Sequence, residues 1–134
     1  MMVIDTSALV AILEQEEEAG ALAGAIASDP VCLVSAASVV ETGLVLFARH
    51  GEPGARKLDE LLRESQIEVV PVTVEHARLA REAFALFGKG RHPAKLNFGD
   101  CFSYALAKAS GHPLLFKGND FSQTDLAAAL SEPR

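Results

Sequence analysis

Cysteine is scarce in this sequence: the two cysteines are too few and too far apart for a disulfide framework or a cysteine-based zinc site. Cys32 stands in an apolar run and Cys101 in an expected helix, which is typical of small buried residues in a reducing compartment. No apolar run approaches the roughly 20 residues that span a bilayer. The N-terminal apolar run has no basic segment before it and is interrupted by Asp5. We therefore expect no signal peptide, no membrane association and a cytoplasmic location.

Positive charge is also in short supply, with 12 Lys and Arg against 18 Asp and Glu and a net charge of -6. This balance argues against a broad basic face for nucleic acid, although it leaves room for a local basic strip. Acidic residues are concentrated at Glu14 and Glu16–Glu18, which predicts a solvated helix start. The 134 residues contain no internal repeat and no dividing linker, and 49% of them are apolar. We expect one domain over residues 1–134.

Short apolar runs alternate with helical patterns along the whole chain. Strands are expected over residues 2–4, 31–34, 67–70 and 114–116. Helices are expected over residues 8–13, 19–26, 36–47, 55–62, 74–87, 100–109 and 125–130, with residues 131–134 frayed. Helix 36–47 is predicted to bury an apolar face that includes Val40, Leu44 and Phe47. The order predicts an α/β three-layer sandwich, in which helices flank a mainly parallel central sheet of four or five strands.

Two aspartates bracket the segment LNFGDCFSYALAKASGHPLLFKGNDF. Asp100 falls in the first turn of a helix that Gly111 and Pro113 close, and a capping role alone would explain it. Asp120 follows the last expected strand in a Gly-Asn-Asp turn, where turn formation alone would explain it equally well. Ligands of open parallel sheets bind outside the carboxyl ends of the strands, so Asp120 lies where chemistry is expected.

Two further acidic residues are candidates for the same edge. Asp5 directly follows the first expected strand, and since Thr6 or Ser7 could cap the next helix, we favour a functional role for Asp5. Glu41 lies among apolar residues of its helix, where its side chain either reaches solvent or is held by a partner or cation. Judged alone, the solvated interpretation of Glu41 is favoured.

If Asp5, Glu41, Asp100 and Asp120 converge, their mutual repulsion calls for a neutralising cation. All four offer hard oxygen donors without an accompanying Cys or His, which selects Mg²⁺ or Mn²⁺ over Zn²⁺. Such an ion can activate water and stabilise charge on a phosphate, so phosphodiester hydrolysis fits the pattern. The flexible basic loop Gly88–Lys95 precedes the Asp100 helix. Its cations Lys89, Arg91 and Lys95 could hold flanking phosphates, although such a loop is usually an ordinary connection.

The motifs VIDTSAL, the Glu41 helix, LNFGDCFSYALAKA and LLFKGNDFSQTDL resemble, in order, those of the PIN-domain ribonucleases, specifically the VapC-type toxins. The resemblance implies a PIN-like fold and an acidic quartet of Asp5, Glu41, Asp100 and Asp120 that binds Mg²⁺ or Mn²⁺. It also implies a homodimer, a cognate antitoxin that covers the site, and cleavage of structured RNA such as transfer RNA. Supporting polar residues would be Thr6, Ser7, Asn97 and Asn119. Asn119 departs from the two acidic residues that often precede the Phe.

Three other classes of protein share part of this pattern. A phosphoacceptor receiver domain would use Lys117, but it also needs a carboxylate after the central strand, where Pro71-Val72-Thr73 follows. An aspartate-nucleophile phosphatase needs an acid two residues after Asp5, but that residue is Ser7. The remaining alternative is a catalytically weak or inactive PIN-fold module that binds a protein.

Overall fold

The computed structural model describes residues 1–130, so the fraying expected for residues 131–134 lies outside the described residues. One sheet contains β1 (Met2–Ile4), β2 (Cys32–Ser35), β3 (Glu68–Val70) and β4 (Leu114–Leu115). Its four strands are all parallel and lie in the order β3-β2-β1-β4. The predicted parallel sheet is therefore confirmed, and the direction of strand addition reverses beside β1.

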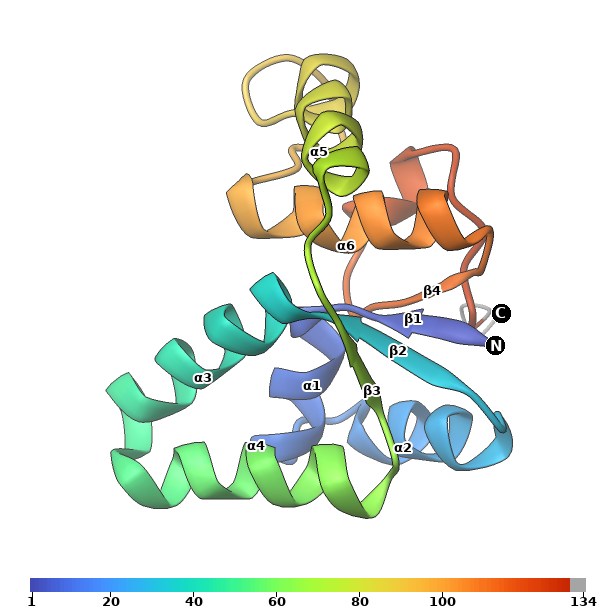
Figure 1. The fold of residues 1–134 in the computed structure, drawn as a ribbon. Helices are drawn as coiled ribbons and strands as arrows, with labels where there is room; N and C mark the ends of the chain where they lie inside the picture. The colour runs from blue at the N-terminus through green and yellow to red at the C-terminus, as the bar shows by residue number, and fades with distance from the viewer. Residues whose placement is uncertain (131–134) are drawn as a thin grey trace.

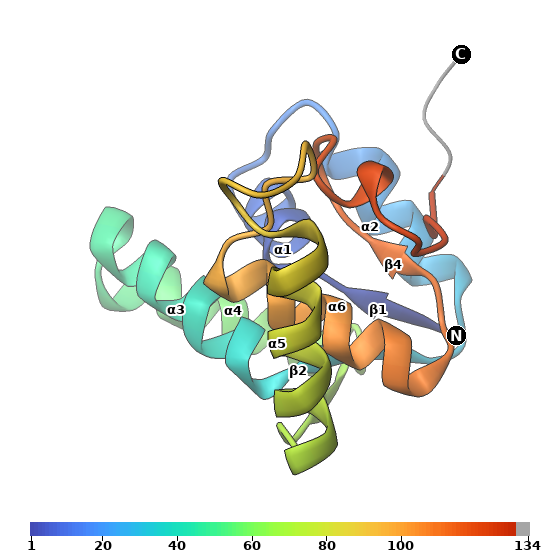
Figure 2. The same cartoon turned by 90° about the horizontal axis from the view of Figure 1, so that it is seen from above.

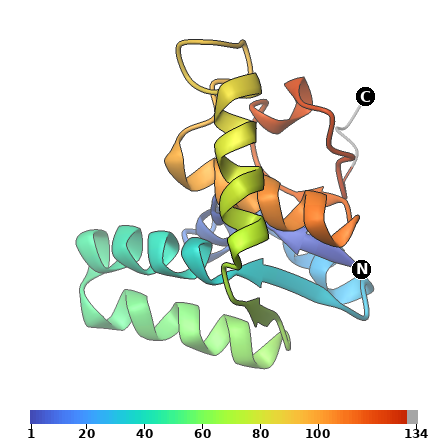
Figure 3. The same cartoon turned by 45° about the horizontal axis from the view of Figure 1, so that its top comes forward.

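The helices form the two outer layers of the predicted α/β sandwich. The described helices are α1 (Thr6–Leu13), α2 (Ala19–Ser28), α3 (Ala36–His50), α4 (Glu52–Glu64), α5 (Val74–Phe87), α6 (Phe98–Ser110) and the 3₁₀-helix η1 (Phe121–Gln123). Figures 1 and 3 show α1, α2 and α4 on one side of the sheet and α5 and α6 on the other. Seen from above, α3 projects to the side of the molecule away from the N-terminus (Figure 2).

Strands β1, β2 and β4 each contribute side chains to both halves of the core, because successive side chains point to opposite faces of the sheet. Met2 and Ile4 of β1 pack with α1, α2 and α4, whereas Val3 packs with α5 and α6. Leu114 and Leu115 of β4 divide in the same way. This two-sided burial explains why the strands read as short continuous apolar runs rather than as alternating ones.

Helix caps fix where the helices leave the carboxyl edge of the sheet. The side chains of Asp5 and Ser35 accept hydrogen bonds from the backbone two residues on, at the starts of α1 and α3. Thr73 caps α5 and Asn97 caps α6, and Gly111 ends α6 in the left-handed conformation at φ 73°. Figure 1 shows that α1, α3 and α6 all begin near the ends of β1 and β2. The acidic residues at these helix starts are therefore brought toward one edge.

The predicted helix over residues 125–130 is wrong. This segment runs extended beside β4, where the Leu114 N–H donates to the Ala127 carbonyl and the Ala129 N–H donates to the Leu114 carbonyl. Asp125 anchors it to α6 by accepting from the Tyr104 hydroxyl at 2.8 Å. The edge of β4 supplies hydrogen-bond partners for the backbone of residues 127 and 129. A helix of six residues would leave most of its backbone groups without such partners, and this outweighs the helix propensity of alanine.

The apolar face predicted for α3 is also wrong in part. Val40, Leu44 and Phe47 are 61%, 67% and 58% exposed, and we call these three residues the α3 stripe. The buried face of α3 carries Ser38 and Thr42 together with Leu46. Two hydroxyl side chains point inward because, as described below, the interior beside α3 holds a buried carboxylate.

No helix among residues 1–130 is both long and apolar enough to cross a membrane.

Candidate active site

Asp5 lies at the end of β1 and is only 2% exposed. Its Oδ2 accepts from the Ser7 N–H at 2.9 Å and its Oδ1 accepts from the Ser103 hydroxyl at 2.5 Å. Burial raises the pKa of Asp5 above its usual range, and the hydrogen bonds from Ser103 and Ser7 oppose that rise. Asp5 therefore caps α1, although the sequence favoured a functional role over a capping role for this residue. It is also a buried carboxylate.

Ser103 is a site residue that the sequence analysis missed. It is fully buried on α6, and its Oγ also lies 3.2 Å from the Ser38 Oγ of α3. The Ser38 carbonyl accepts from the Thr42 hydroxyl at 2.8 Å and, more weakly, from the Thr6 hydroxyl at 3.4 Å. These contacts join β1, α3 and α6 behind Asp5. The available signal was a small hydroxyl residue one turn after Asp100, on the inward face of the same helix.

Asp100 begins α6 in a reciprocal capping box with Asn97. The Asp100 N–H donates to the Asn97 Oδ1 at 2.9 Å, and the Asn97 N–H donates to the Asp100 Oδ2 at 3.0 Å. Burial raises the pKa of Asp100 to about 7, with further upward contributions from the charges of Asp5, Asp120 and Glu41. The charges of Asp5, Glu41 and Asp120 thus act on the Asp100 carboxyl group. That the four carboxylates share one cation stays a prediction.

Glu41 is half-buried on α3 and lies against the first turn of α6. A Cβ placed on Gly99 would overlap the Glu41 carboxylate, so the two residues are in direct contact. Glu41 is thus only partly withdrawn from solvent, and the solvated position favoured from sequence alone is neither confirmed nor contradicted. Gly99 precedes Asp100 in the chain, and this contact explains how the α3 carboxylate comes beside the α6 carboxylate.

Asp120 and Asn119 lie beyond β4 in the predicted turn and are both exposed. The buried Phe121 anchors this turn by packing on Phe116, with the ring centroids 5.4 Å apart. The Ser7 hydroxyl accepts from the Lys117 N–H at 3.0 Å, which ties the segment after β4 to the start of α1. The carboxylate at the end of β4 is thereby held on the same edge as Asp5.

The basic loop is less free than the sequence predicted. Backbone hydrogen bonds close it on itself, including Lys89 N–H to the Leu96 carbonyl and His92 N–H to the Gly88 carbonyl. Arg91 and Lys95 remain exposed, and neither forms an ion pair with any residue between 1 and 130. The loop leads into Asn97 and α6, so Arg91 and Lys95 are separated by only a few residues from Asp100.

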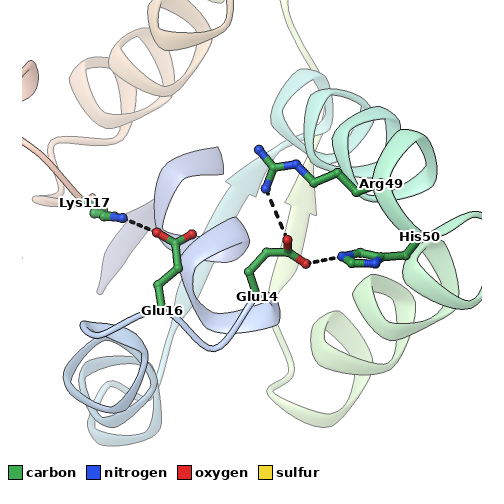
Figure 4. A network of polar contacts seen from close by, with 5 residues as sticks. All are labelled: Glu14, Glu16, Arg49, His50 and Lys117. Carbon is green, nitrogen blue, oxygen red and sulfur yellow. Dashed lines mark hydrogen bonds and ion pairs between the residues drawn. The ribbon is translucent and has the colours of Figure 1, made fainter.

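Lys117 and the acidic segment after α1 form a separate polar network (Figure 4). Glu16 is paired with Lys117, and Glu14 accepts from His50 Nε2 at 2.6 Å and from Arg49 at 3.3 Å. The bond from His50 is the main reason why the pKa of Glu14 is lowered. Glu14 and Glu16 are therefore not simply solvated, as predicted, but join the α1–α2 connection to α3 and to the segment after β4.

The donor set fits a hard divalent cation, since it consists of carboxylate oxygens at a partly buried edge. Within residues 1–130, however, no three His, Cys, Asp or Glu side chains are grouped closely enough to hold a metal ion as they stand. Asp5 and Asp100 each direct at least one oxygen to a helix cap. The structure thus shows neighbouring acidic side chains, of which Asp5 and Asp100 are held by hydrogen bonds within the protein.

A parallel sheet with acidic residues at its carboxyl edge is consistent with a PIN domain, and the chain belongs to the PIN-domain family. The family profile described as PIN domain matches residues 2–126. Within that family the chain is of the VapC type. It is 58% identical over 127 residues to Ribonuclease VapC of Mycolicibacterium smegmatis, a match covering 95% of this chain and 98% of that protein.

Solved structures support the same fold. The crystal structure of Mycobacterium tuberculosis VapC20, described as a sarcin-ricin loop cleaving toxin, matches with a TM-score of 0.78 at 22% identity and covers 95% of this chain and 97% of VapC20. A toxin–antitoxin complex from Klebsiella pneumoniae contains a chain that matches with a TM-score of 0.69 at 17% identity, covering 93% of both chains. At these identities the likeness establishes the PIN fold alone.

Proposed function

We propose that this protein is a Mg²⁺- or Mn²⁺-dependent endoribonuclease that hydrolyses RNA phosphodiester bonds as the toxin of a toxin–antitoxin pair. The observation that carries the proposal is that four acidic residues come from separate elements at the carboxyl edge of the sheet. Asp5 follows β1, Glu41 of α3 contacts Gly99 beside Asp100, and a hydrogen bond from Lys117 to Ser7 ties the segment that leads to Asp120 to the start of α1. The similarity to Ribonuclease VapC supports the reaction. The proposal places its action in the cytoplasm, where RNA is available.

Asp5, Glu41, Asp100 and Asp120 would hold the cation. When bound, the ion would supply an activated water and stabilise charge on the scissile phosphate. Asp100 has to lose its proton to become a ligand. Because its pKa is about 7, this deprotonation requires little free energy near neutral pH. Asn97 orients Asp100 through the capping box, and Ser7 orients Asp5. Thr6 and Asn119 complete the proposed polar surroundings.

Cleavage of a pool of structured cellular RNA, with and without EDTA, tests this function. We expect cleavage with Mg²⁺ or Mn²⁺, loss of cleavage in EDTA, and recovery when Mn²⁺ is added in excess. Cleavage that persists in EDTA would contradict the metal-dependent mechanism. Absence of cleavage under every condition would instead favour the alternative of a protein-binding PIN module.

Arg91 and Lys95 are proposed to hold RNA phosphates beside the acidic edge. Changing both to alanine should weaken RNA binding and flatten its salt dependence by about 0.7 in the log–log slope for each lost phosphate contact. Binding is measured on the Asp100→Asn background, so that RNA stays intact. Arg56→Ala with Lys57→Ala, two exposed cations of α4, is the matched control. An unchanged slope would rule out this role for the loop.

The α3 stripe is proposed as part of the antitoxin site. Val40 adjoins Glu41 in the chain, and Leu44 and Phe47 continue the same exposed face, so a bound segment could cover the stripe and the acidic edge together. The likeness to a chain of a toxin–antitoxin complex supports such a partner. An apolar segment of the partner would bury the three side chains, which are costly to leave in water as one patch.

Leu44→Glu should therefore weaken antitoxin binding by about 2 kcal/mol, which is the size of a strong interface position, and leave RNA cleavage unchanged. The affinity can be measured by calorimetry, with the cognate antitoxin purified separately and titrated into each variant. Val74→Glu, at an apolar residue of α5 that is still more exposed than Leu44, is the control. Equal affinities for the two variants would remove the α3 stripe from the antitoxin interface.

A homodimer is also proposed, and a second apolar surface supports it. Phe98 is 81% exposed and stacks edge-on to Phe102, next to a groove between α5 and α6 that Ala77, Phe84 and Cys101 line. Burial of this groove by a second copy would remove it from water. Sedimentation equilibrium should give twice the chain mass of 14.2 kDa, and a monomer at micromolar concentration would contradict the proposal.

A further inference from the structure

Gly99 is the second residue of α6, and its missing side chain leaves the space that the Glu41 carboxylate fills. A Cβ at this position would overlap both carboxylate oxygens and the Cδ of Glu41. The backbone of Gly99 is not in the left-handed region, in contrast to Gly111 at φ 73°. The helix therefore does not need glycine at residue 99 for its conformation, so the contact with Glu41 is what distinguishes this position.

Nothing else in the described structure holds the Glu41 carboxylate in place. Asp5 accepts from Ser103 and Ser7, and Asp100 accepts from the Asn97 N–H. Between residues 1 and 130, by contrast, no hydrogen bond or ion pair reaches the Glu41 side chain. Its position rests on packing against the first turn of α6, where the positive end of the helix dipole offsets part of the repulsion from Asp100.

We propose that Gly99 is a positioning residue, whose absent side chain sets the place of the Glu41 carboxylate beside Asp100. The expected effect on metal binding rests on the proposed function, whereas the contact itself does not. A larger residue at 99 would push the carboxylate out of this place. Because a carboxylate is the far end of a flexible side chain, it can swing toward solvent without unfolding the protein.

Gly99→Ala is therefore expected to fold normally and to lose the position of Glu41. Gly20 is the matched control, since it is also the second residue of its helix, α2, and a Cβ there meets nothing within 4 Å. Both variants should melt cooperatively, with melting temperatures at or a few degrees above that of the wild type, because alanine favours a helix over glycine. If Gly99→Ala fails to fold, Glu41 cannot yield and the proposal is wrong.

Crystal structures of the metal-free wild type, Gly99→Ala and Gly20→Ala test the contact directly. We expect the Glu41 carboxylate to lie on residue 99 in the wild type and in Gly20→Ala, and to have moved away in Gly99→Ala. An unmoved carboxylate in Gly99→Ala would overturn the proposal. This readout does not depend on whether the protein cleaves RNA or binds metal.

Mn²⁺ titration by calorimetry tests the consequence for the site. Gly99→Ala should weaken Mn²⁺ binding by about 10–100-fold, as displaced supporting groups do, while Gly20→Ala leaves it unchanged. Glu41→Asp withdraws the carboxylate by one methylene, so adding Gly99→Ala to Glu41→Asp should cause little further loss. Additive losses would overturn the positioning role. If the wild type binds no Mn²⁺, the proposed metal dependence fails, and the crystal structures still decide whether Gly99 places Glu41.

Discussion

Replacing Asp100 by asparagine should reduce RNA cleavage to background and, at the same time, stabilise the metal-free protein above pH 7. The asparagine keeps the size of the side chain and an oxygen that can accept from the Asn97 N–H, so the capping box survives. It removes the negative charge that burial and three neighbouring carboxylates disfavour. A residue selected only to cap α6 would give no such gain.

The sign of the stability effect follows from the pKa of Asp100, which rises from 3.8 to about 7 on folding. The folded protein binds this proton more tightly than the unfolded chain, so its stability falls as pH rises between about 4 and 7 and is level above that. The full shift corresponds to about 4 kcal/mol, but Asp100 is partly exposed, so screening should leave about 1–2 kcal/mol.

Denaturant unfolding in EDTA at pH 4 and pH 8 measures this effect. Asp100→Asn should exceed the wild type at pH 8 and match it near pH 4, where both side chains are neutral. Asp59→Asn, an exposed position on α4, is the control and should change little at either pH. Mn²⁺ should raise the melting temperature of the wild type but not that of Asp100→Asn. A large loss of stability in Asp100→Asn would show that Asp100 is mainly structural.

Residues at element boundaries could be predicted from the sequence because their environment is local. Asp5 follows a strand and Asp100 begins a helix, and both junctions are visible in the pattern of apolar residues. The parallel sheet then brings strand ends to one edge by general rules of topology. The positions of Asp5, Asp100 and Asp120 at the ends of their elements could therefore be predicted from the sequence, although their roles remain proposals.

Features that depend on how two helices cross could not be predicted in this way. Ser103 and Gly99 each act on a residue far away in the chain, and neither stands out in the helical pattern of α6. The α3 stripe was assigned to the core because apolar residues are usually buried, but the inward face of α3 is taken by Ser38 and Thr42 behind Asp5. Because the buried Asp5 carboxylate needs polar neighbours, hydroxyl side chains face the interior at α3 and apolar ones face solvent.

Ser103→Ala should destabilise the metal-free protein at neutral pH by about 1–3 kcal/mol, because it leaves the buried Asp5 carboxylate without one of its donors. It should also weaken Mn²⁺ binding by about 10–100-fold, since Asp5 loses the bond that orients its Oδ1. Loss of this donor raises the pKa of Asp5 further above its usual range. The destabilisation should therefore shrink at low pH, where a protonated Asp5 does not need the Ser103 hydroxyl.

A double-mutant cycle separates this role from a simple packing defect. Ser38→Ala removes a hydroxyl that touches Ser103 but forms no hydrogen bond with Asp5, so it should have a smaller effect on Mn²⁺ affinity. On the Asp5→Asn background the pH dependence of the Ser103→Ala loss should disappear, because no charge remains for the hydroxyl to stabilise. If the loss keeps the same pH dependence when Asp5 is asparagine, Ser103 serves packing alone, and the orientation of Asp5 has to come from the Ser7 N–H.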